Sequence, residues 1–320
     1  MGETYILGLD IGGTSIKAGL VNQNGDIKDV QIIPTNSAQG PKHVLGTVAN
    51  LITYYQEHEF IKGIGIALAG SINSKSGACI YSPNLNWTGI EIGRIIGEAA
   101  GTEVRIINDA SAACLGEYHF GAGCGYKNIV CITIGTGIGS GVILDNKLFI
   151  GTSGLAPEAG HMIIVKDGPL CPCGSRGCWE ALVSATAIVK KAVEQRNAST
   201  DTVLDNYSRG EPDSLTIKEI FKAWQENDYL VVEIINDVQE YLAIGLANLI
   251  NILNPQCIIL GGGVMDLHNE FTIGLEEKVS KYVFPSLKDS VIIKKAKLGN
   301  NAGLIGGASL FLKEIGTIGG

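Results

Sequence analysis

The chain has 320 residues, of which 45% are hydrophobic and 18% charged, a balance that fits a folded protein long enough for two domains. Its net charge of −8, without a block of Lys or Arg, argues against nucleic acid as a partner. The N-terminus has no basic segment before a long apolar run, and no apolar stretch reaches the roughly 18 residues of a membrane span. We therefore expect a cytoplasmic protein that binds neither nucleic acid nor a membrane.

The first elements form a strand–loop–strand unit that occurs twice. Residues 4–22 run YILGLD, IGGT, SIKAGLVN, and Asn24-Gly25 then gives a hairpin-turn signal before a third strand, DIKDVQII. The same plan returns at 128–151 with NIVCITI, GTGIG, SGVIL and the turn Asp145-Asn146. This internal duplication predicts two similar α/β halves that face each other.

The remaining text alternates helices and strands. Helical periodicity marks residues 43–58, 90–101 and 110–121, whereas 61–70 and 103–109 read as strands. Further helices are predicted at 184–196, at 228–253 before Pro255, and at 300–315. The capping-box pair Thr216 and Glu219 predicts one more helix that begins at this point. A strand at 257–261 leads into glycines. No low-complexity linker divides the chain, so short hinges should join the halves.

The first glycine loop, in LDIGGTSIK, could bind phosphate. Gly12 and Gly13 leave room for backbone amides to approach an anion, and Thr14 and Lys17 could add a hydroxyl donor and a charge. Asp10, at the end of the strand, could hold Mg²⁺ through water. The motif is neither a Walker loop nor a dinucleotide fingerprint, because a strand follows it. The alternative is a tight glycine hairpin.

A second glycine loop, TIGTGIGSG, occurs at 133–141. Because both duplicated hairpins carry such a loop, simple tight turns explain the two loops less well than a shared binding role does. Two such loops in duplicated hairpins could clamp a polyphosphate from both sides. The residues of this loop that we expect at the phosphates are Thr133, Gly135, Thr136, Gly137 and Gly139.

Asn108-Asp109 lies at a strand-to-helix junction. Asp109 could be a helix N-cap. It could also be the base that accepts the proton of a hydroxyl attacking a γ-phosphoryl group. The residues alone leave both alternatives open.

Three of the eight cysteines are clustered with a histidine. His161, Cys171, Cys173 and Cys178 fall within 18 residues, and three thiolates with an imidazole suit tetrahedral zinc. The intervening glycines 174 and 177 would let the chain wrap around an ion. A chance cluster or a redox pair of Cys171 and Cys173 are the alternatives, but a C-x-C pair has poor disulfide geometry.

Two glutamates flank this cluster. A metal there would fix Glu158 and Glu180, whose carboxylates, with the His161 ring, could bind a polyhydroxylated ligand. The alternative is ordinary surface charge.

Together these stretches resemble the ROK (repressor, ORF, kinase) family of the sugar kinase/actin/Hsp70 superfamily. The resemblance spans nearly the whole chain and rests on DIGGTSIK (10–17), the IAL-A-GSIN turn (65–73), SPNLNW (82–87), NDA (108–110), GTGIGSG (135–141), PEAGH (157–161), CPCGSRGCWE (171–180) and ILGGGV (259–264). It implies an α/β fold of the duplicated actin/hexokinase-like (ribonuclease H-like) type, with two domains and a central cleft. We expect a smaller domain at 1–117, completed by a C-terminal helix at about 301–320, and a larger domain at 118–300 that carries the zinc loop.

The resemblance also implies ATP-dependent phosphorylation of a hexose, most like the glucokinases of this family. Asp109 matches the catalytic base. The positions that match the sugar-binding residues are Asn108, Glu158, His161 and Glu180, joined by Gly70 and Asn84. The residues that match the zinc ligands are His161, Cys171, Cys173 and Cys178, so that His161 would meet both metal and sugar. Both glycine loops match phosphate segments, and the residues that match the adenosine side are Gly261, Gly262 and Gly263. ATP, Mg²⁺ and structural Zn²⁺ are the implied cofactors, and a homodimer or homotetramer the implied assembly.

Two departures from the family pattern bear on the sugar. Ala69-Gly70 with Asn73 stands where Pro-Gly and a later Asp are frequent, and Pro157 stands where Gly often precedes the first sugar-binding Glu. Glucose is the first expected substrate, with N-acetylmannosamine, N-acetylglucosamine, fructose and allose as alternatives. Two other classes are a sugar-sensing repressor and an actin- or Hsp70-like ATPase. The first hairpin starts within ten residues of Met1, so we expect no helix-turn-helix domain before it.

Overall fold

The computed structural model describes residues 4–73, 76–196, 202–208, 214–267, 269–313 and 316–318. It divides into two compact units: unit 1 comprises Met1–Cys131, Ser140–Pro157 and Ala296–Gly320, and unit 2 comprises Ile132–Gly139 and Glu158–Lys295. The boundary at residue 117 that was expected with the family resemblance stays a prediction.

Unit 1 is built on a five-stranded sheet with the order β3-β2-β1-β4-β8. Its strands are β1 (Tyr5–Ile11), β2 (Ser15–Val21), β3 (Ile27–Pro34), β4 (Ile61–Leu68) and β8 (Val104–Asn108). The hairpins β1–β2 and β2–β3 are antiparallel, whereas β1, β4 and β8 run parallel, so the glycine loop and the end of β8 lie at one edge of the sheet. The strands predicted in this region are confirmed.

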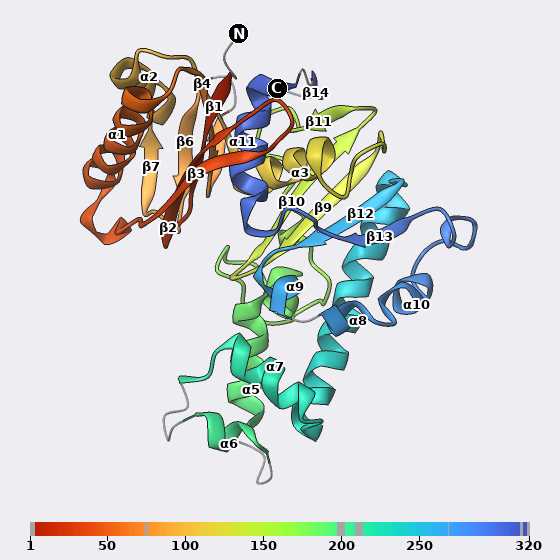
Figure 1. Ribbon diagram of the computed structural model, residues 1–320. Helices are drawn as coiled ribbons and strands as arrows, with labels where there is room; N and C mark the ends of the chain where they lie inside the picture. Colours follow the sequence, from red (N-terminus) through yellow and green to blue (C-terminus); the bar gives the residue numbers. More distant parts are fainter. Residues whose placement is uncertain are drawn as a thin grey trace. The chain divides into compact units, whose positions relative to one another are not determined.

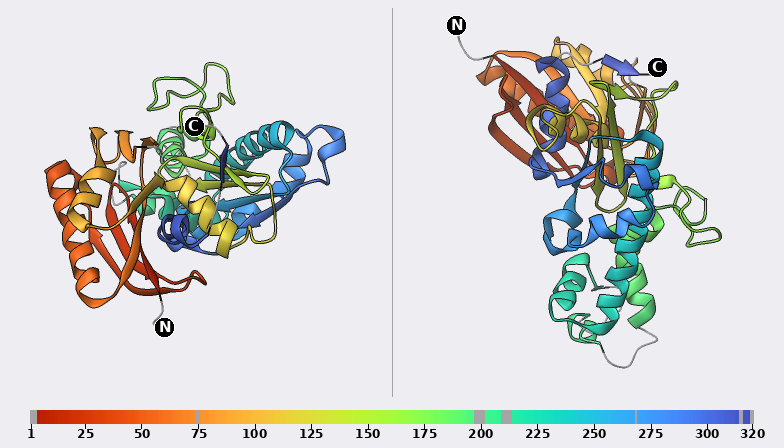
Figure 2. Two further views of the ribbon diagram at one scale, coloured as in Figure 1. Left: turned by 90° about the horizontal axis from the view of Figure 1, so that it is seen from above. Right: turned by 90° about the vertical axis from the view of Figure 1, so that its right-hand side faces the viewer.

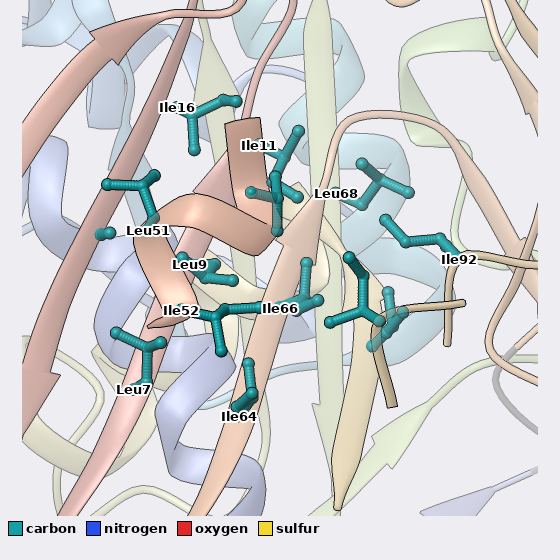
Figure 3. Close-up of a cluster of buried hydrophobic side chains, with 14 of the residues drawn as sticks. Leu7, Leu9, Ile11, Ile16, Leu51, Ile52, Ile64, Ile66, Leu68 and Ile92 are labelled. Atoms are coloured by element: carbon teal, nitrogen blue, oxygen red, sulfur yellow. The ribbon is translucent and has the colours of Figure 1, made fainter. Parts of the chain in front are cut away.

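Helices cover both faces of this sheet (Figure 1). On one side lie α1 (Pro41–His58) and α2 (Ile92–Ala100), and on the other α3 (Asp109–Phe120) and α11 (Ala302–Leu312). Between α1 and the sheet, Leu9, Ile52 and Ile66 belong to a buried hydrophobic core (Figure 3). Burial of such side chains is the main stabilising term, at roughly 1.5–3 kcal/mol for each fully buried residue.

Glycines allow α11 to lie directly against the sheet and against α3. A Cβ on Gly65 of β4 would lie 2.0 Å from the carbonyl oxygen of Gly307, and one on Gly306 would lie 1.7 Å from that of Ala112. Backbone therefore packs on backbone here. The C-terminal helix predicted at about 301–320 is too long, because α11 ends at Leu312 and Gly316–Ile318 form strand β14.

Two further sheets complete the strands of the chain. A small antiparallel sheet of β5 (Ser71–Asn73), β6 (Ala78–Ser82) and β7 (Trp87–Ile90) was not predicted, since its strands have three to five residues. A six-stranded sheet has the order β13-β12-β9-β10-β11-β14. Its strands are β9 (Ile129–Ile134), β10 (Ile138–Leu144), β11 (Lys147–Phe149), β12 (Cys257–Gly261), β13 (Ile292–Lys295) and β14 (Gly316–Ile318).

Most of the helices of unit 2 lie between residues 180 and 280 (Figure 2). They are α4 (Glu180–Val183), α5 (Ala185–Arg196), α6 (Leu204–Tyr207), α7 (Ile217–Gln225), α8 (Tyr229–Leu253), α9 (Gly263–Leu267) and α10 (Leu275–Ser280). The predicted capping box of Thr216 and Glu219 is confirmed at the start of α7. Short 3-10 helices occur at η1 (Ser37–Gln39), η2 (Ala159–His161), η4 (Asn269–Thr272), η5 (Pro285–Leu287) and η6 (Gly299–Asn301). Within the described ranges, no helix combines the length and apolar character needed to cross a bilayer.

Candidate active site

Asp109 is the first residue of α3, directly after the parallel strand β8. The N-cap is Asn108, whose Oδ1 accepts a hydrogen bond from the amide of Ser111 at 3.0 Å. Asp109 is therefore not needed as the cap. Its Oδ1 accepts from the amide of Ala110 and from Nδ2 of Asn108, both at 2.9 Å. These bonds fix the carboxylate and leave Oδ2 as the oxygen that can receive a proton.

Two buried carboxylates of unit 1, Asp10 and Asp109, both have raised pKa values. Burial raises the pKa of Asp10 to about 6, with the charge of Asp109 as a second cause and Lys17 opposing both. Burial likewise raises the pKa of Asp109, although the hydrogen bonds from Ala110 and Asn108 act in the opposite direction. A carboxylate with a raised pKa is a stronger proton acceptor, which is the property a general base needs.

The loop Gly12–Thr14 is held as a tight turn. The amide of Gly12 donates to the carbonyl of Ser15 at 3.0 Å, and the hydroxyl of the buried Thr35 donates to the carbonyl of Gly12 at 2.6 Å. Thr14 is exposed at its tip. A Cβ on Gly13 would lie 2.9 Å from the carbonyl oxygen of Asn84, so the loop contacts the segment that contains this residue.

Lys17 follows this loop on β2, opposite Asp10 in the register of β1 and β2. Its Nζ donates to the carbonyl of Asn300 and lies 3.4 Å from Oδ1 of Asn301, just before α11. Burial lowers the pKa of Lys17, whereas Asp10 raises it. Lys17 is thus tied to protein groups at the start of α11.

Gly70 and Asn108 are also joined in unit 1. Nδ2 of Asn108 donates to the carbonyl of Gly70 at 3.0 Å. Gly70 has φ 141°, and a Cβ there would lie 2.7 Å from the carbonyl oxygen of Tyr81, which explains the glycine. Asn84, by contrast, is exposed on the loop between β6 and β7. Unit 1 thus brings together Asp10, Gly70, Asn108 and Asp109 at the end of the sheet.

The second glycine loop belongs to unit 2 and is held mainly through its carbonyl groups. The carbonyl of Gly135 accepts from the amide of Ala185 at 2.8 Å, and that of Thr136 accepts from the hydroxyl of Thr186 at 2.8 Å. Thr136 is exposed, whereas Thr133 and Gly139 are half-buried. The first turn of α5 therefore fixes this loop.

The glycines after β12 lie beside the same loop. A Cβ on Gly262, which has φ 89°, would lie 2.6 Å from both N and O of Ile134, so Gly262 contacts the end of β9. Nothing lies within 4 Å of a Cβ on the exposed Gly263, and Gly261 is buried as the last residue of β12.

The predicted metal ligands come together in unit 2. The ligand atoms of His161, Cys171, Cys173 and Cys178 all lie within 4.8 Å of one another. Nδ1 of His161 is 3.7 Å from Sγ of Cys171, and the Sγ atoms of Cys173 and Cys178 are 3.6 Å apart. A tetrahedron with ligands about 2.0–2.3 Å from zinc has edges of about 3.5–3.8 Å, so donor set and spacing fit this ion.

The sharp wrapping of this loop depends on glycine. Gly174 has φ 93° and Gly177 has φ 75°, and a Cβ on Gly177 would lie 1.6 Å from the carbonyl oxygen of Val165. The glycines thus allow the tight turns that were expected of them, whereas the ion stays a prediction.

The two glutamates beside the cluster differ in their surroundings. The Glu158 side chain is 56% exposed, and its Oε2 lies 4.0 Å from Nε2 of His161, on the ring edge opposite the cysteines. Oε2 of Glu180 accepts from the amide of Ile138 at 2.9 Å, and Oε1 lies 3.8 Å from Sγ of Cys171. The Glu158 side chain is thus more than half exposed, whereas Glu180 is bonded to the glycine loop.

The description "ROK family" belongs to a family model that matches residues 6–314. The chain belongs to the ROK family. Among its relatives is a glucokinase of Streptomyces coelicolor, 34% identical over 307 residues that cover 95% of this chain and 96% of the relative. A xylose repressor of Bacillus spizizenii is 32% identical over 314 residues, covering 97% of this chain and 77% of the repressor.

A solved ROK structure agrees with this assignment. The crystal structure of a ROK family glucokinase from Streptomyces griseus, in complex with glucose and AMPPNP, matches with a TM-score of 0.85 and 33% identity, covering 96% of this chain and 98% of that one. The predicted ROK resemblance and the actin/hexokinase-like fold class are confirmed.

Several residues that shape this ROK site were not predicted. Thr35 lies far along the chain from the loop it closes, and no local pattern marks it. Ile138 acts through its backbone, which sequence does not display. Trp179 has a local signal, since a large aromatic residue between Cys178 and Glu180 is suited to anchoring this segment in the core.

Proposed function

We propose that this protein is an ATP-dependent hexose kinase that transfers the γ-phosphoryl group of ATP to the 6-hydroxyl of glucose. The observation that carries the proposal is Asp109: a carboxylate fixed through Oδ1 at the start of a helix, with a raised pKa. The similarity to proteins named glucokinase supports the acceptor.

In the proposed reaction, the sugar oxygen attacks the γ-phosphorus as Asp109 takes its proton, and ADP leaves with the electrons of the broken P–O bond. Positioning and charge neutralisation supply most of the rate in such transfers. Asp10 would hold a hydrated Mg²⁺ that neutralises phosphate charge when bound, since hard cations of this kind take oxygen ligands. The repulsion between Asp10 and Asp109 favours a cation beside them.

The nucleotide contacts are proposed for both glycine loops and for the glycines after β12. The residues proposed for this role are Gly12, Gly13, Thr14, Lys17, Thr133, Gly135, Thr136, Gly137, Gly139, Gly261, Gly262 and Gly263. Their backbone amides would meet phosphate oxygens where no side chain intervenes.

The sugar contacts are proposed for Gly70, Asn84, Asn108, Glu158, His161 and Glu180. Zn²⁺ on the cluster would supply rigidity, and Nδ1 of His161 would bind it while Nε2 faces the sugar beside Glu158. We further propose a homodimer or homotetramer, which light scattering would measure.

The second candidate is a non-catalytic sugar sensor, favoured by the similarity to a xylose repressor. A sensor needs a sugar site but no base with a raised pKa. The geometry of Asp109 therefore weighs towards catalysis.

A coupled assay of ATP consumption over a panel of hexoses tests the proposal. Glucose should stimulate ATP consumption most, and Asp109→Asn should abolish the stimulation while glucose still binds. Sugar binding by the wild-type protein without phosphorylation of any hexose would instead identify a sensor. ATP consumption independent of sugar would indicate an actin- or Hsp70-like ATPase.

A further inference from the structure

Both ends of the cysteine–histidine loop, Gly160 to Glu180, meet one residue of the glycine loop. A Cβ on Gly160 would lie 2.5 Å from the carbonyl oxygen of Ile138, so the start of the loop packs on that peptide group. At the other end, Oε2 of Glu180 accepts the amide hydrogen of the same residue at 2.9 Å. Ile138 is the centre of GTGIGSG, so each end of the cysteine–histidine loop contacts the backbone of the glycine loop.

Glu180 is held firmly enough to transmit a displacement. It directly follows Cys178 and Trp179, which are both fully buried. Nε1 of Trp179 donates to the carbonyl of Tyr241 at 3.0 Å, and a Cβ on Gly245 would lie 2.1 Å from the indole, so the ring is seated against α8. A displacement of the cluster would therefore also displace the carboxylate of Glu180, because only the buried Trp179 separates Cys178 from Glu180.

The glycines of the loop have different neighbours. A Cβ on Gly137 would lie 2.3 Å from Oε2 of Glu180, so this glycine makes room for the carboxylate. Nothing lies within 4 Å of a Cβ on Gly135, which is the position left open for a ligand. The sequence GTG thus combines one glycine that admits a protein carboxylate with one that leaves space for an anion.

We propose that Glu180 is a positioning residue that couples the cysteine–histidine cluster to the glycine loop 135–139, so that metal and nucleotide stabilise each other's binding. This inference rests on the proposed function, because it takes the loop as a phosphate-binding segment. One oxygen of Glu180 holds the Ile138 amide and the other faces Cys171, so the residue bridges the two sites. Coupling of this kind is reciprocal: if bound metal orders the loop for nucleotide, nucleotide raises the affinity for metal.

The experiment measures zinc affinity by competition with a chelator of known affinity, with and without saturating Mg-AMPPNP. In the wild-type protein, the nucleotide analogue should tighten zinc binding by about fivefold or more. Glu180→Ala should reduce this effect below about twofold, whereas Glu180→Gln should keep part of it, because an amide oxygen still accepts from Ile138. Glu194→Gln, a change at an exposed glutamate that lies 3.9 Å from Lys190, is the matched control and should behave as wild type.

A second variant guards against a folding defect in Glu180→Ala. Gly137→Ala places a methyl group where the carboxylate lies and should also lose the coupling, with its circular dichroism unchanged. In steady state, Glu180→Ala should raise KM for ATP as well as KM for glucose.

Three results would overturn the inference. The first is a wild-type zinc affinity that bound AMPPNP leaves unchanged. The second is undiminished coupling in Glu180→Ala, and the third is a rise in KM for glucose alone, which would make Glu180 a sugar contact only. If AMPPNP does not bind the wild-type protein by calorimetry, the proposed function fails together with the coupling.

Discussion

Asp109 in unit 1 and Glu180 in unit 2 are both carboxylates held in place, but different forces hold them. Asp109 follows a strand of a sheet that packs on a buried hydrophobic core, and its Oδ1 accepts hydrogen bonds from the Ala110 amide and the Asn108 side chain. Glu180 ends a loop whose Ile163 and Leu170 are 63% and 57% exposed, so apolar burial there is concentrated at Cys171, Cys178 and Trp179.

This difference teaches that one fold can place one functional group by packing and offer another a set of metal ligands. The start of a helix that directly follows a strand of a packed sheet is fixed by that packing, whether or not a metal is bound. A loop with exposed apolar side chains gains from another source of stabilisation, and a metal bound to the cysteine–histidine cluster would supply it. The two regions should therefore respond in opposite ways to chelators and to core substitutions.

The largest expected effect is at the packed region. Asp109→Asn should lower kcat by about 10²–10⁴-fold, the usual contribution of a general base. The zinc content should stay the same, and the melting temperature should stay the same or rise. Asn108 keeps the cap, so α3 should remain intact. In the wild type, kcat should fall with acidification as the raised pKa of Asp109 is crossed, and retention of full activity in the variant would remove Asp109 as the base.

The next effect is at the ligated region. Cys178→Ser should weaken zinc binding by more than about 100-fold, since changes to residues behind metal ligands already cost 10–100-fold. Zinc competition gives the affinity, and hydrogen exchange should show faster exchange in 158–180 but unchanged protection of β1 and β4. Loss of protection throughout unit 1 would contradict the separation of the two regions.

A pair of glycine substitutions examines the packing of α11. Gly65→Ala should cost about 1–3 kcal/mol of unfolding free energy, because its Cβ would lie 2.0 Å from the carbonyl oxygen of Gly307. Gly46→Ala is the matched control: nothing lies within 4 Å of its Cβ, and alanine in a helix should add about 0.5–1 kcal/mol. Urea unfolding measures both, and equal stabilities would show that α11 has room to move.

The smallest effect should come from Asp10. Its pKa is raised to about 6 in the fold, above the ordinary 3.8, so the ionised form costs stability above about pH 6 and the penalty disappears as the pH falls towards 4. Asp10→Asn should therefore raise the unfolding free energy by about 1 kcal/mol at pH 7 without Mg²⁺, since solvent at the half-buried side chain reduces the full effect. A smaller stabilisation by Asp10→Asn at pH 7 than at pH 4 would contradict the predicted upward shift in the pKa of Asp10.

Much of the fold follows from local patterns in the sequence. Alternation and turn residues predicted β1 to β3 and β9 to β11, and the turn at Asp145 and Asn146 has the positive φ angles, 48° and 60°, that a tight hairpin needs. The members of the cysteine–histidine cluster also lie close together in the sequence, so the cluster could be predicted from it.

Long-range features could not be read in the same way. The contact of Glu180 with the Ile138 amide joins residues 42 positions apart through backbone, whose amide is the same for nearly every residue type. Strand β14 has only three residues, too few for a periodic signal, and its pairing with β11 depends on tertiary context.

The close seating of α11 on the sheet has a consequence for biosynthesis. Ribosomes build chains from the N-terminus, and 194 positions separate the end of β8 at Asn108 from the start of α11 at Ala302. At about 5–20 residues per second, the nascent sheet waits roughly 10–40 s for the helix that covers it. During that interval the face of the sheet that α11 later covers lacks this helix, and a chaperone could bind there.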